Sequence, residues 1–217
     1  MKVFIDFDDV IFNAKKFKND LIKIFLKNGI TKSEFENSYY TFAKKDQDRR
    51  KYYDPKSQIQ VLRRRRQINQ KKLNLEIDAL MKNLEKYVFP DVRDFLDNFP
   101  KKDLFLLTYG HVKFQKNKIK GAGIGKYFRK TIISRDNKAD DILETAKKIK
   151  LLAEEEIILI DDRPEQIERA KRRKKKITAF RMCRKEGRYS DLICLHKDYE
   201  VKTLMEVLKI IKKEGIK

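Results

Sequence analysis

The chain has 217 residues and a formal net charge of +21, with 54 Lys and Arg against 33 Asp and Glu. Its 41% hydrophobic residues, which include 14 Phe and 9 Tyr, argue against a disordered chain and are sufficient for a folded core. The two cysteines give no disulfide framework or zinc pattern, and neither a signal peptide nor a membrane span is evident, so we expect a cytoplasmic protein without a membrane partner.

The first predicted strand, Val3 to Ile5, ends in a group of carboxylates. Asp6, Asp8 and Asp9 follow it within four positions. Carboxylates held at one strand end repel one another unless a cation lies between them. The simplest such cation is a divalent one that prefers oxygen ligands, most plausibly Mg²⁺. The alternative is an exposed acidic turn.

Residues 14–88 are predicted to form four helices and no strand. Asn28-Gly29 suits a helix C-terminal cap, and Asp54-Pro55 is typical of a helix start. Residues 46–53 are charged and are predicted to form a loop. The apolar positions at helical spacing are Phe17, Leu21, Ile24 and Phe25, then Phe35, Tyr39 and Phe42, then Ile59 and Leu62, and finally Leu73, Ile77, Leu80, Met81 and Leu84.

From Pro90 onward, predicted strands alternate with predicted helices. Alternation of this kind is typical of a parallel, doubly wound sheet. We therefore expect an α/β fold, with a Rossmann-like core made of residues 1–13 and 89–217 and an inserted helical domain at 14–88. The predicted strands are 104–108, 131–134, 157–160 and 177–182, and the predicted helices are 91–98, 112–120, 139–150, 164–173 and 201–213.

Polar side chains lie at the predicted strand ends. Thr108 ends one strand, Asp161 and Asp162 follow another, and Lys138 precedes a helix. In an open parallel sheet, ligands bind outside the carboxyl ends of the strands, so we expect these side chains to lie beside Asp6. Carboxylates for a metal, with a hydroxyl and an ammonium for an oxyanion, indicate phosphate chemistry.

These motifs resemble those of the haloacid dehalogenase-like (HAD) hydrolase superfamily. Its first motif, Asp-x-Asp-x-Val/Thr, is matched by Asp6 to Val10, and its second, an apolar strand ending in Thr or Ser, by Leu104 to Thr108. Its third motif, a Lys ahead of a helix, is matched by Lys138, and its fourth, an apolar strand ending in an acidic pair, by Ile157 to Asp162. The order is the family's, and the helical insertion lies where the family carries its C1-type cap.

The resemblance implies a mechanism. Asp6 would attack phosphorus to form an aspartyl-phosphate, and Asp8 would act as general acid and then as general base. Mg²⁺ would be held by Asp6, Asp8 (through its backbone carbonyl) and Asp162, with Asp161 as a second ligand or an outer partner. Many members have Gly-Asp at this last position, which leaves the direct ligand open. An acid two positions after the nucleophile implies a phosphatase or phosphomutase rather than a P-type ATPase.

The phosphate is expected to contact Thr108, Lys138 and the backbone amides around Tyr109 and Gly110. His111 either contacts the substrate or serves as a cap. Several other residues remain open: Lys113, Lys116 and Lys118 compete with Lys138 for the phosphate, Arg163 either reaches phosphate or pairs with Asp161 or Asp9, and Cys183, Cys194 and His196 are interpreted as packing or surface residues.

Two basic runs stand out, Arg63 to Arg66 and Lys171 to Lys176. The second lies at the C-terminal end of a predicted helix, where cations favour the helix dipole and remain solvated. The first lies within residues 14–88, which carry 20 basic and 9 acidic side chains. Arg63 and Arg66 share one helix face. They either form a solvated helix end or bind a second anionic group of the substrate.

We therefore predict a Mg²⁺-dependent phosphomonoester hydrolase, with a small phosphorylated metabolite or a nucleotide as substrate. The net charge of +21 also fits a nucleic-acid-end phosphatase, or a nucleic-acid-binding protein that uses the basic helical domain. A HAD-like interaction module without turnover is a third reading, and the complete set of motif residues argues against it. The substrate and the oligomeric state stay open.

Overall fold

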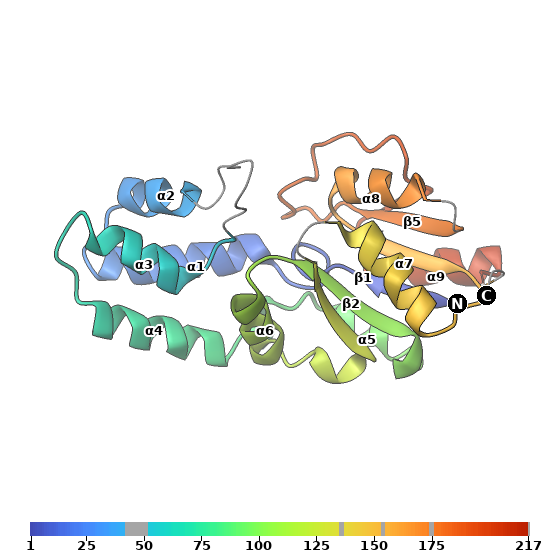
Figure 1. The fold of residues 1–217 in the computed structure, drawn as a ribbon, viewed down its shortest axis with the longest axis horizontal. Coiled ribbons are helices and arrows are strands. Elements are labelled where there is room, and N and C mark those ends of the chain that lie inside the picture. Colours follow the sequence, from blue (N-terminus) through green and yellow to red (C-terminus); the bar gives the residue numbers. More distant parts are fainter. Residues whose placement is uncertain (42–51, 135–136, 153–154, 174–175, 217) are drawn as a thin grey trace. The chain divides into compact units, whose positions relative to one another are not determined.

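The chain divides into two compact units (Figure 1). The core unit comprises Met1–Lys15, Tyr87–Tyr109 and Ile124–Lys217, and the helical unit comprises Lys16–Lys86 and Gly110–Gly123. These divisions fall close to the predicted boundaries of the helical insertion, but they group residues 110–123 with the helices. The computed structural model describes residues 1–41, 52–134, 137–152, 155–173 and 176–216, and no helix in these ranges is long and apolar enough to cross a membrane.

A parallel sheet lies at the centre of the core unit. Its strands run in the spatial order β3-β2-β1-β4-β5-β6, and every neighbouring pair is parallel. The first strand of the chain thus lies between β2 and β4, the point at which the strand order reverses and where ligands bind in such sheets. This confirms the predicted doubly wound α/β fold. The strands are β1 (Lys2–Ile5), β2 (Leu104–Tyr109), β3 (Lys130–Ser134), β4 (Ile157–Asp161), β5 (Ile177–Met182) and β6 (Tyr199–Val201).

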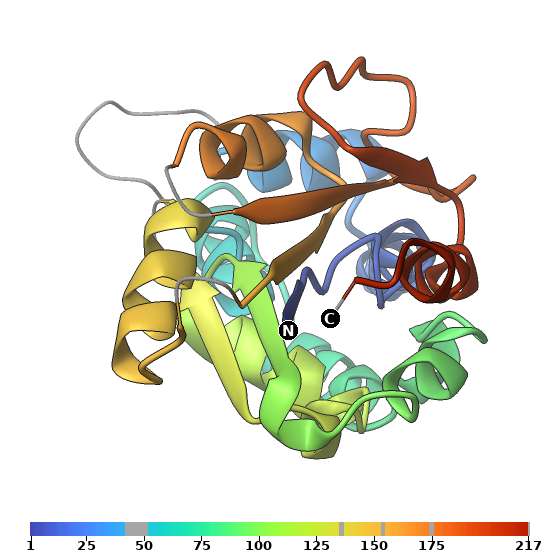
Figure 2. The ribbon, with the colours of Figure 1, turned by 90° about the vertical axis from the view of Figure 1, so that its right-hand side faces the viewer.

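Helices cover both faces of this sheet, as Figure 2 shows. On one face lie α7 (Lys138–Lys148) and α8 (Pro164–Lys171), and on the other lie α5 (Val92–Leu96) and α9 (Leu204–Glu214). The strands are therefore almost continuously apolar, because both of their faces are buried. Alternate strand residues pack under α7 and α8, where the rings of Phe4 and Phe105 stack at 4.8 Å.

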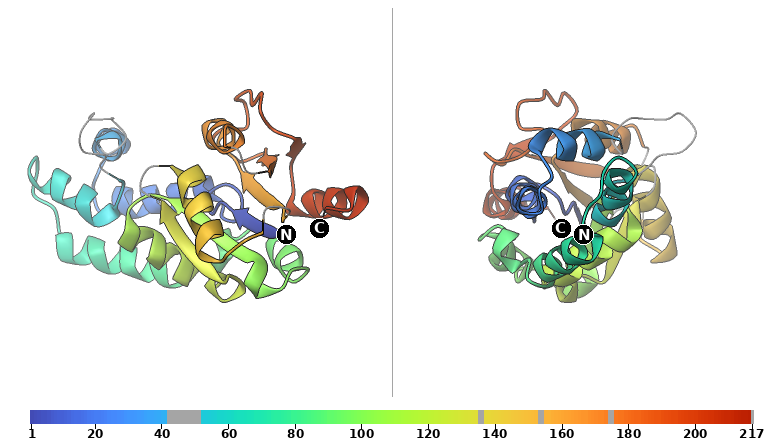
Figure 3. Two further views of the ribbon diagram at one scale, coloured as in Figure 1. Left: turned by 45° about the vertical axis from the view of Figure 1, so that its right-hand side comes forward. Right: turned by 90° about the vertical axis from the view of Figure 1, so that its left-hand side faces the viewer.

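The helical unit contains helices from two distant parts of the chain. Its α6 (Val112–Gly121) lies beside α4 (Gln70–Lys82), as Figures 1 and 3 show. The contact is close, since a Cβ added at Gly121 would lie 2.3 Å from the backbone oxygen of Met81. The other helices of this unit are α1 (Ala14–Lys27), whose first two residues belong to the core unit, α2 (Lys32–Tyr40) and α3 (Pro55–Arg63).

Local signals set the helix starts of this unit. Thr31 and Glu34 form a reciprocal capping box at α2. The side chain of Asp54 accepts from the backbone nitrogen of Ser57 at 3.0 Å, and Pro55 occupies the first turn of α3, as predicted. The four helices expected in residues 14–88 are confirmed. Phe42 and most of the predicted loop, residues 46–51, lie outside the described part of the chain.

The last predicted helix begins later than the sequence pattern indicated. Val201 was predicted to start the last helix, but it ends β6, a short edge strand that pairs with β5. The helix begins instead at Leu204, after Thr203, whose hydroxyl accepts from the backbone nitrogen of Glu206 at 3.2 Å. Short 3₁₀ turns complete the described structure at Glu85–Tyr87, Lys101–Asp103 and Gly125–Tyr127.

Candidate active site

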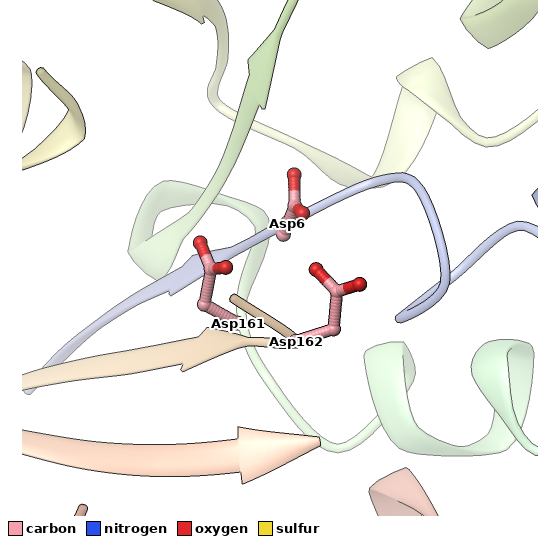
Figure 4. A group of neighbouring side chains, drawn as sticks. All are labelled: Asp6, Asp161 and Asp162. Atoms are coloured by element: carbon pink, nitrogen blue, oxygen red, sulfur yellow. The ribbon is translucent and has the colours of Figure 1, made fainter. Parts of the chain in front are cut away.

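Three carboxylates converge at the ends of β1 and β4 (Figure 4). Asp6 follows β1, Asp161 is the last residue of β4, and Asp162 comes next. Parallel pairing aligns these ends, because Ile5 pairs with Ile160 and the Asp6 nitrogen donates to the Ile160 oxygen at 2.9 Å. One oxygen from each carboxylate lies within 4.8 Å of the others, and all three side chains are buried.

Lys138 connects two of these carboxylates. Its Nζ lies 2.8 Å from Asp6 Oδ1 and 2.6 Å from Asp161 Oδ2, and the side chain is only 1% exposed. Lys138 is the first residue of α7, after the N-cap Asn137, and its backbone nitrogen donates to Gln166 Oε1 at 3.4 Å. Burial lowers the pKa of Lys138, but the charges of Asp161 and Asp6 outweigh burial and leave that pKa above its ordinary value. Lys138 is therefore an ammonium.

The neighbouring residues Asp161 and Asp162 differ in their partners. Asp161 is satisfied, because Oδ2 accepts from Lys138 and Oδ1 accepts from the Arg163 backbone nitrogen at 2.9 Å. Both carboxylate oxygens of Asp162 are buried, and neither has a hydrogen-bond donor in the part of the chain that the structure describes. Burial, with the charges of Asp6 and Asp161, holds the pKa of Asp162 well above its usual range. A buried carboxylate of this kind is suited to a cation.

Asp6 is perturbed in the same direction. Burial raises its pKa to about 6, the charges of Asp161 and Asp8 act in the same sense, and Lys138 opposes them. Its Oδ1 also accepts from the Phe7 backbone nitrogen at 2.8 Å, which orients the carboxylate. Two perturbed carboxyl groups and one ammonium at a sheet switch point are what a catalytic site is expected to contain.

Asp8 and Asp9 occupy the turn after Asp6. Asp8 is half-buried, and its backbone forms an isolated bridge with Phe12. Asp9 is buried and takes a left-handed backbone conformation, with a φ of 60°. Its Oδ1 accepts from the backbone nitrogen of Ala14 at 3.2 Å, and its Oδ2 accepts from the guanidinium of Arg188. Asp9 therefore holds the start of α1.

The remaining predicted site residues are divided between the two units. Thr108 is buried near the end of β2 in the core unit, and the ring of Tyr109 lies 5.5 Å from the Arg163 guanidinium carbon. Gly110, with a φ of 145°, and His111 begin the second segment of the helical unit. His111 caps α6, because its Nδ1 accepts from the Phe114 nitrogen at 3.4 Å. Lys113, Lys116 and Lys118 also lie in that unit.

The two arginines that were considered as substrate ligands, Arg63 and Arg66, already have partners. Arg66 donates to both carboxylate oxygens of Glu34 at 3.1 Å and to the Gly29 oxygen at 2.9 Å. Arg63 donates to Gln70 on the next helix. A substrate anion at either position would have to replace these contacts.

Sequence reasoning missed a set of arginines that begins near the end of β5 and continues into the loop after it. Arg181 is fully buried and donates to the Asp162 backbone oxygen, while Arg184 donates to the Val10 oxygen at 2.9 Å. The sequence signal is three arginines spaced by three and four residues, at positions 181, 184 and 188, of which the first lies near the end of a buried strand and the other two follow that strand. Arg163 was expected to reach phosphate or to pair with Asp161 or Asp9. Its guanidinium pairs with Glu165, and its backbone nitrogen donates to Asp161.

Comparisons with known proteins place this arrangement in a family. Among the solved structures that share the fold is a haloacid dehalogenase-like hydrolase of Burkholderia xenovorans LB400, with 16% identity, a TM-score of 0.75, and coverage of 99% of this chain and 98% of that one. A magnesium-bound HAD-hydrolase of Bacillus subtilis has 16% identity and a TM-score of 0.65, and the match covers 97% of this chain and 98% of that one. A protein described as a beta-phosphoglucomutase from Thermotoga maritima has 15% identity and a TM-score of 0.64, and the match covers 98% of this chain and 99% of that one. A search of curated proteins found no match. The profile of the haloacid dehalogenase-like hydrolases matches residues 3–180, from the start of β1 through most of β5. The chain therefore belongs to the haloacid dehalogenase-like hydrolases.

Proposed function

We propose that this hydrolase is a Mg²⁺-dependent phosphomonoesterase that acts through an aspartyl-phosphate on Asp6. The observation that carries the proposal is the buried cluster of Asp6, Asp161 and Asp162, in which Lys138 satisfies two carboxylates and Asp162 has no donor within the described ranges. The three carboxylates carry more negative charge than the single ammonium of Lys138 offsets, and a bound cation would compensate for the excess.

The residues present fit a hard divalent cation. All the candidate ligands are carboxylate oxygens, which Mg²⁺ prefers, and the cluster contains no sulfur or imidazole ligand among the described residues. Asp6 and Asp162 are the direct ligands that we propose, with the backbone carbonyl of Asp8, and Asp161 supports them through Lys138. When bound, Mg²⁺ would neutralise these carboxylates and withdraw charge from the phosphoryl oxygens.

The chain's own residues divide the chemistry. Asp6, oriented by Phe7 and Lys138, attacks phosphorus and takes the phosphoryl group. Asp8 gives a proton to the leaving oxygen and then removes one from the water that hydrolyses the aspartyl-phosphate. Lys138 and Thr108 hold the phosphoryl oxygens, together with the backbone amide of Tyr109.

Some structures that share this fold are described as dehalogenases. Dehalogenation and phosphate-ester hydrolysis make different demands on the residues of the site. A halide leaves without taking a proton, so an acid two residues after the nucleophile would have no task in dehalogenation. A carboxylate that attacks a halogen-bearing carbon meets no anionic oxygens at the reacting atom, whereas a phosphoryl group carries anionic oxygens whose charge a metal must offset. Asp8 and the cluster around Asp162 therefore favour phosphate esters.

The test is phosphate release from nitrophenyl phosphate, a nucleotide and an oligonucleotide with a terminal phosphate, measured with MgCl₂ and with EDTA. We expect Mg²⁺-dependent release from at least one of them, and no release with EDTA or from the Asp6→Asn variant. Chloride release from chloropropionate without phosphate release would instead identify a dehalogenase. Oligonucleotide binding that weakens with salt, without turnover, would support the nucleic-acid-binding alternative.

A further inference from the structure

The loop between β5 and β6, residues 183–198, returns to the proposed active site. Arg184 Nε and Nη2 donate to the Val10 oxygen at 3.2 and 2.9 Å, and Arg188 binds the carboxylate of Asp9. Arg181, at the end of β5, donates both to the Asp162 oxygen and to the Tyr189 oxygen. The loop is thus fixed against the segments that follow β1 and β4. It lies beyond residues 3–180, the part that the family profile matches.

Two guanidinium groups lie near one ring of this loop. The Arg163 guanidinium carbon lies 5.6 Å from the centre of the Tyr189 ring and 5.5 Å from that of Tyr109, and the Arg188 guanidinium carbon also lies 5.6 Å from the Tyr189 ring. A contact of this kind uses the face of the ring and restrains the guanidinium. The N–H donors lie in the plane of each guanidinium and point outward from it.

Donors remain on both arginines. Arg163 Nε is buried without an acceptor in the described part of the chain. Arg188 uses Nε for Asp9, no acceptor for its Nη1 or Nη2 is found across the described ranges, and its side chain is 43% exposed. An oxygen-rich anion would satisfy such donors, and bidentate binding of a carboxylate or phosphate is the geometry that arginine provides best.

The two arginines are also charged and close to the reacting groups. Burial lowers the pKa of Arg188, but Asp9, Asp8 and Asp162 outweigh burial and raise that pKa. For Arg163, burial is likewise outweighed, by Tyr189, Glu165, Asp161 and Asp6. Arg188 is thus within reach of the charge on Asp8, the proposed proton donor to the leaving oxygen. Arg188 also binds the carboxylate of Asp9, the residue next to Asp8 in the chain.

We propose that Arg163 and Arg188, held against the ring of Tyr189, bind a second anionic group on the leaving-group side of the substrate. This inference rests on the proposed phosphomonoesterase function and names its substrate class: small phosphomonoesters that also carry a carboxylate or a second phosphate. Neither arginine belongs to the four motifs.

The test uses three esters with the same carbon chain: propyl phosphate, the phosphate ester of hydroxypropionate, and propanediol bisphosphate. We expect kcat/KM with Mg²⁺ to be about tenfold or more higher for one of the two doubly anionic esters, and the preferred one identifies the second group as carboxylate or phosphate. Arg163→Gln should reduce this preference about tenfold. Arg172→Gln is the matched control, because it removes the same charge at the opposite, C-terminal end of α8, where Arg172 is exposed and pairs with Glu168. It should keep the preference.

Arg188 requires a milder change, because its loss would leave the buried Asp9 carboxylate unpaired. Arg188→Lys keeps a charge for Asp9 but loses the planar pair of donors, and it should also reduce the preference. Equal kcat/KM for the three esters in the wild type, or an unchanged preference in both Arg163→Gln and Arg188→Lys, would overturn the proposal.

A binding measurement separates this outcome from failure of the proposed function. If no ester releases phosphate, the phosphomonoesterase proposal fails, and calorimetric titration of the same three esters into Asp6→Asn with MgCl₂ still tests the arginines. Tighter binding of a doubly anionic ester, lost when Arg163→Gln is added, supports the second anion site. If a doubly anionic ester has the same dissociation constant in Asp6→Asn and in the double variant with Arg163→Gln, the second anion site is contradicted.

Discussion

The two units each bury polar side chains, but they satisfy them differently. In the helical unit, Gln58 is fully buried, its Nε2 donates to the Phe35 oxygen and to Ser38 Oγ at 2.9 Å, and its Oε1 accepts from the Tyr53 hydroxyl at 2.8 Å. In the core unit, Asp162 is equally inaccessible and neither of its carboxylate oxygens finds a donor in the described residues.

This difference distinguishes a structural polar group from a ligand. Burial of a polar group costs little when each donor and acceptor is paired, and costs much more when one is left without a partner. A satisfied network such as that around Gln58 specifies the packing of its helices. The unsatisfied carboxylate of Asp162 raises the free energy of the metal-free protein, and a bound cation would recover that energy.

The largest effect is expected at the nucleophile. Asp6→Asn removes the attacking carboxylate, so kcat for the best phosphate ester should fall by about 10³-fold or more. Steady-state phosphate release measures this, and circular dichroism controls for the fold. Activity within about tenfold of the wild type would exclude an aspartyl-phosphate at this position.

A matched pair of variants tests the contrast between Asp161 and Asp162 directly. Asp161→Asn removes one of the two carboxylates that pair with the buried ammonium of Lys138, and should lower the free energy of unfolding by about 3 kcal/mol. Asp162→Asn removes an unpartnered buried charge, and should raise the stability of the metal-free protein by about 1 kcal/mol while weakening Mg²⁺ binding by about 100-fold.

Urea unfolding in EDTA and calorimetric titration of Mg²⁺ measure these two quantities. Equal destabilisation by both substitutions would show that Asp162 has a donor in solution. Unchanged Mg²⁺ affinity in Asp162→Asn would remove that residue from the proposed ligands.

A substitution at Gln58 tests the satisfied hydrogen-bond network of the helical unit. Gln58→Leu leaves buried partners without their hydrogen bonds, and should destabilise the protein by about 1–3 kcal/mol. Gln60→Leu is the control, because Gln60 is exposed on the same helix, α3, and its loss should cost at most about 0.5 kcal/mol. If both variants unfold at the same urea concentration, the network around Gln58 does not contribute as described.

The smallest predicted effect concerns pH. Burial raises the pKa of Asp6 from 3.8 to about 6, so its contribution to stability is present below the unfolded pKa and is lost as pH rises through about 6. Asp162 shifts in the same direction. Above that pH the Asp6 carboxylate is ionised and attracts Mg²⁺.

MgCl₂ should therefore raise Tm by a few degrees more at about pH 7.5 than at about pH 5. Differential scanning fluorimetry of the wild type and Asp162→Asn measures this increment. The difference between the two pH values should shrink in the variant. A larger increment at the lower pH would have the wrong sign for carboxylate ligands.

The sequence by itself determined the parts that depend on local pattern and strand direction. Apolar runs ending in Asp6, Thr108 and Asp161 identify strands and their carboxyl ends. Parallel strands place those ends on one edge of a sheet, so the meeting of Asp6 and Asp161 follows from strand direction. Helix starts such as Asp54-Pro55 were equally local, because the cap and the helix it starts are adjacent in the chain.

Only the tertiary structure decided what depends on distant contacts. The three-residue strand β6 has too short a pattern to be recognised and forms by pairing with β5. Asp161 and Asp162 are the same residue type side by side. Lys138 and the Arg163 backbone nitrogen satisfy Asp161, whereas Asp162 has no donor in the described residues. Arg184 and Arg188 bind groups more than 170 residues away, at Val10 and Asp9, since folding brings the β5–β6 loop back to the first strand.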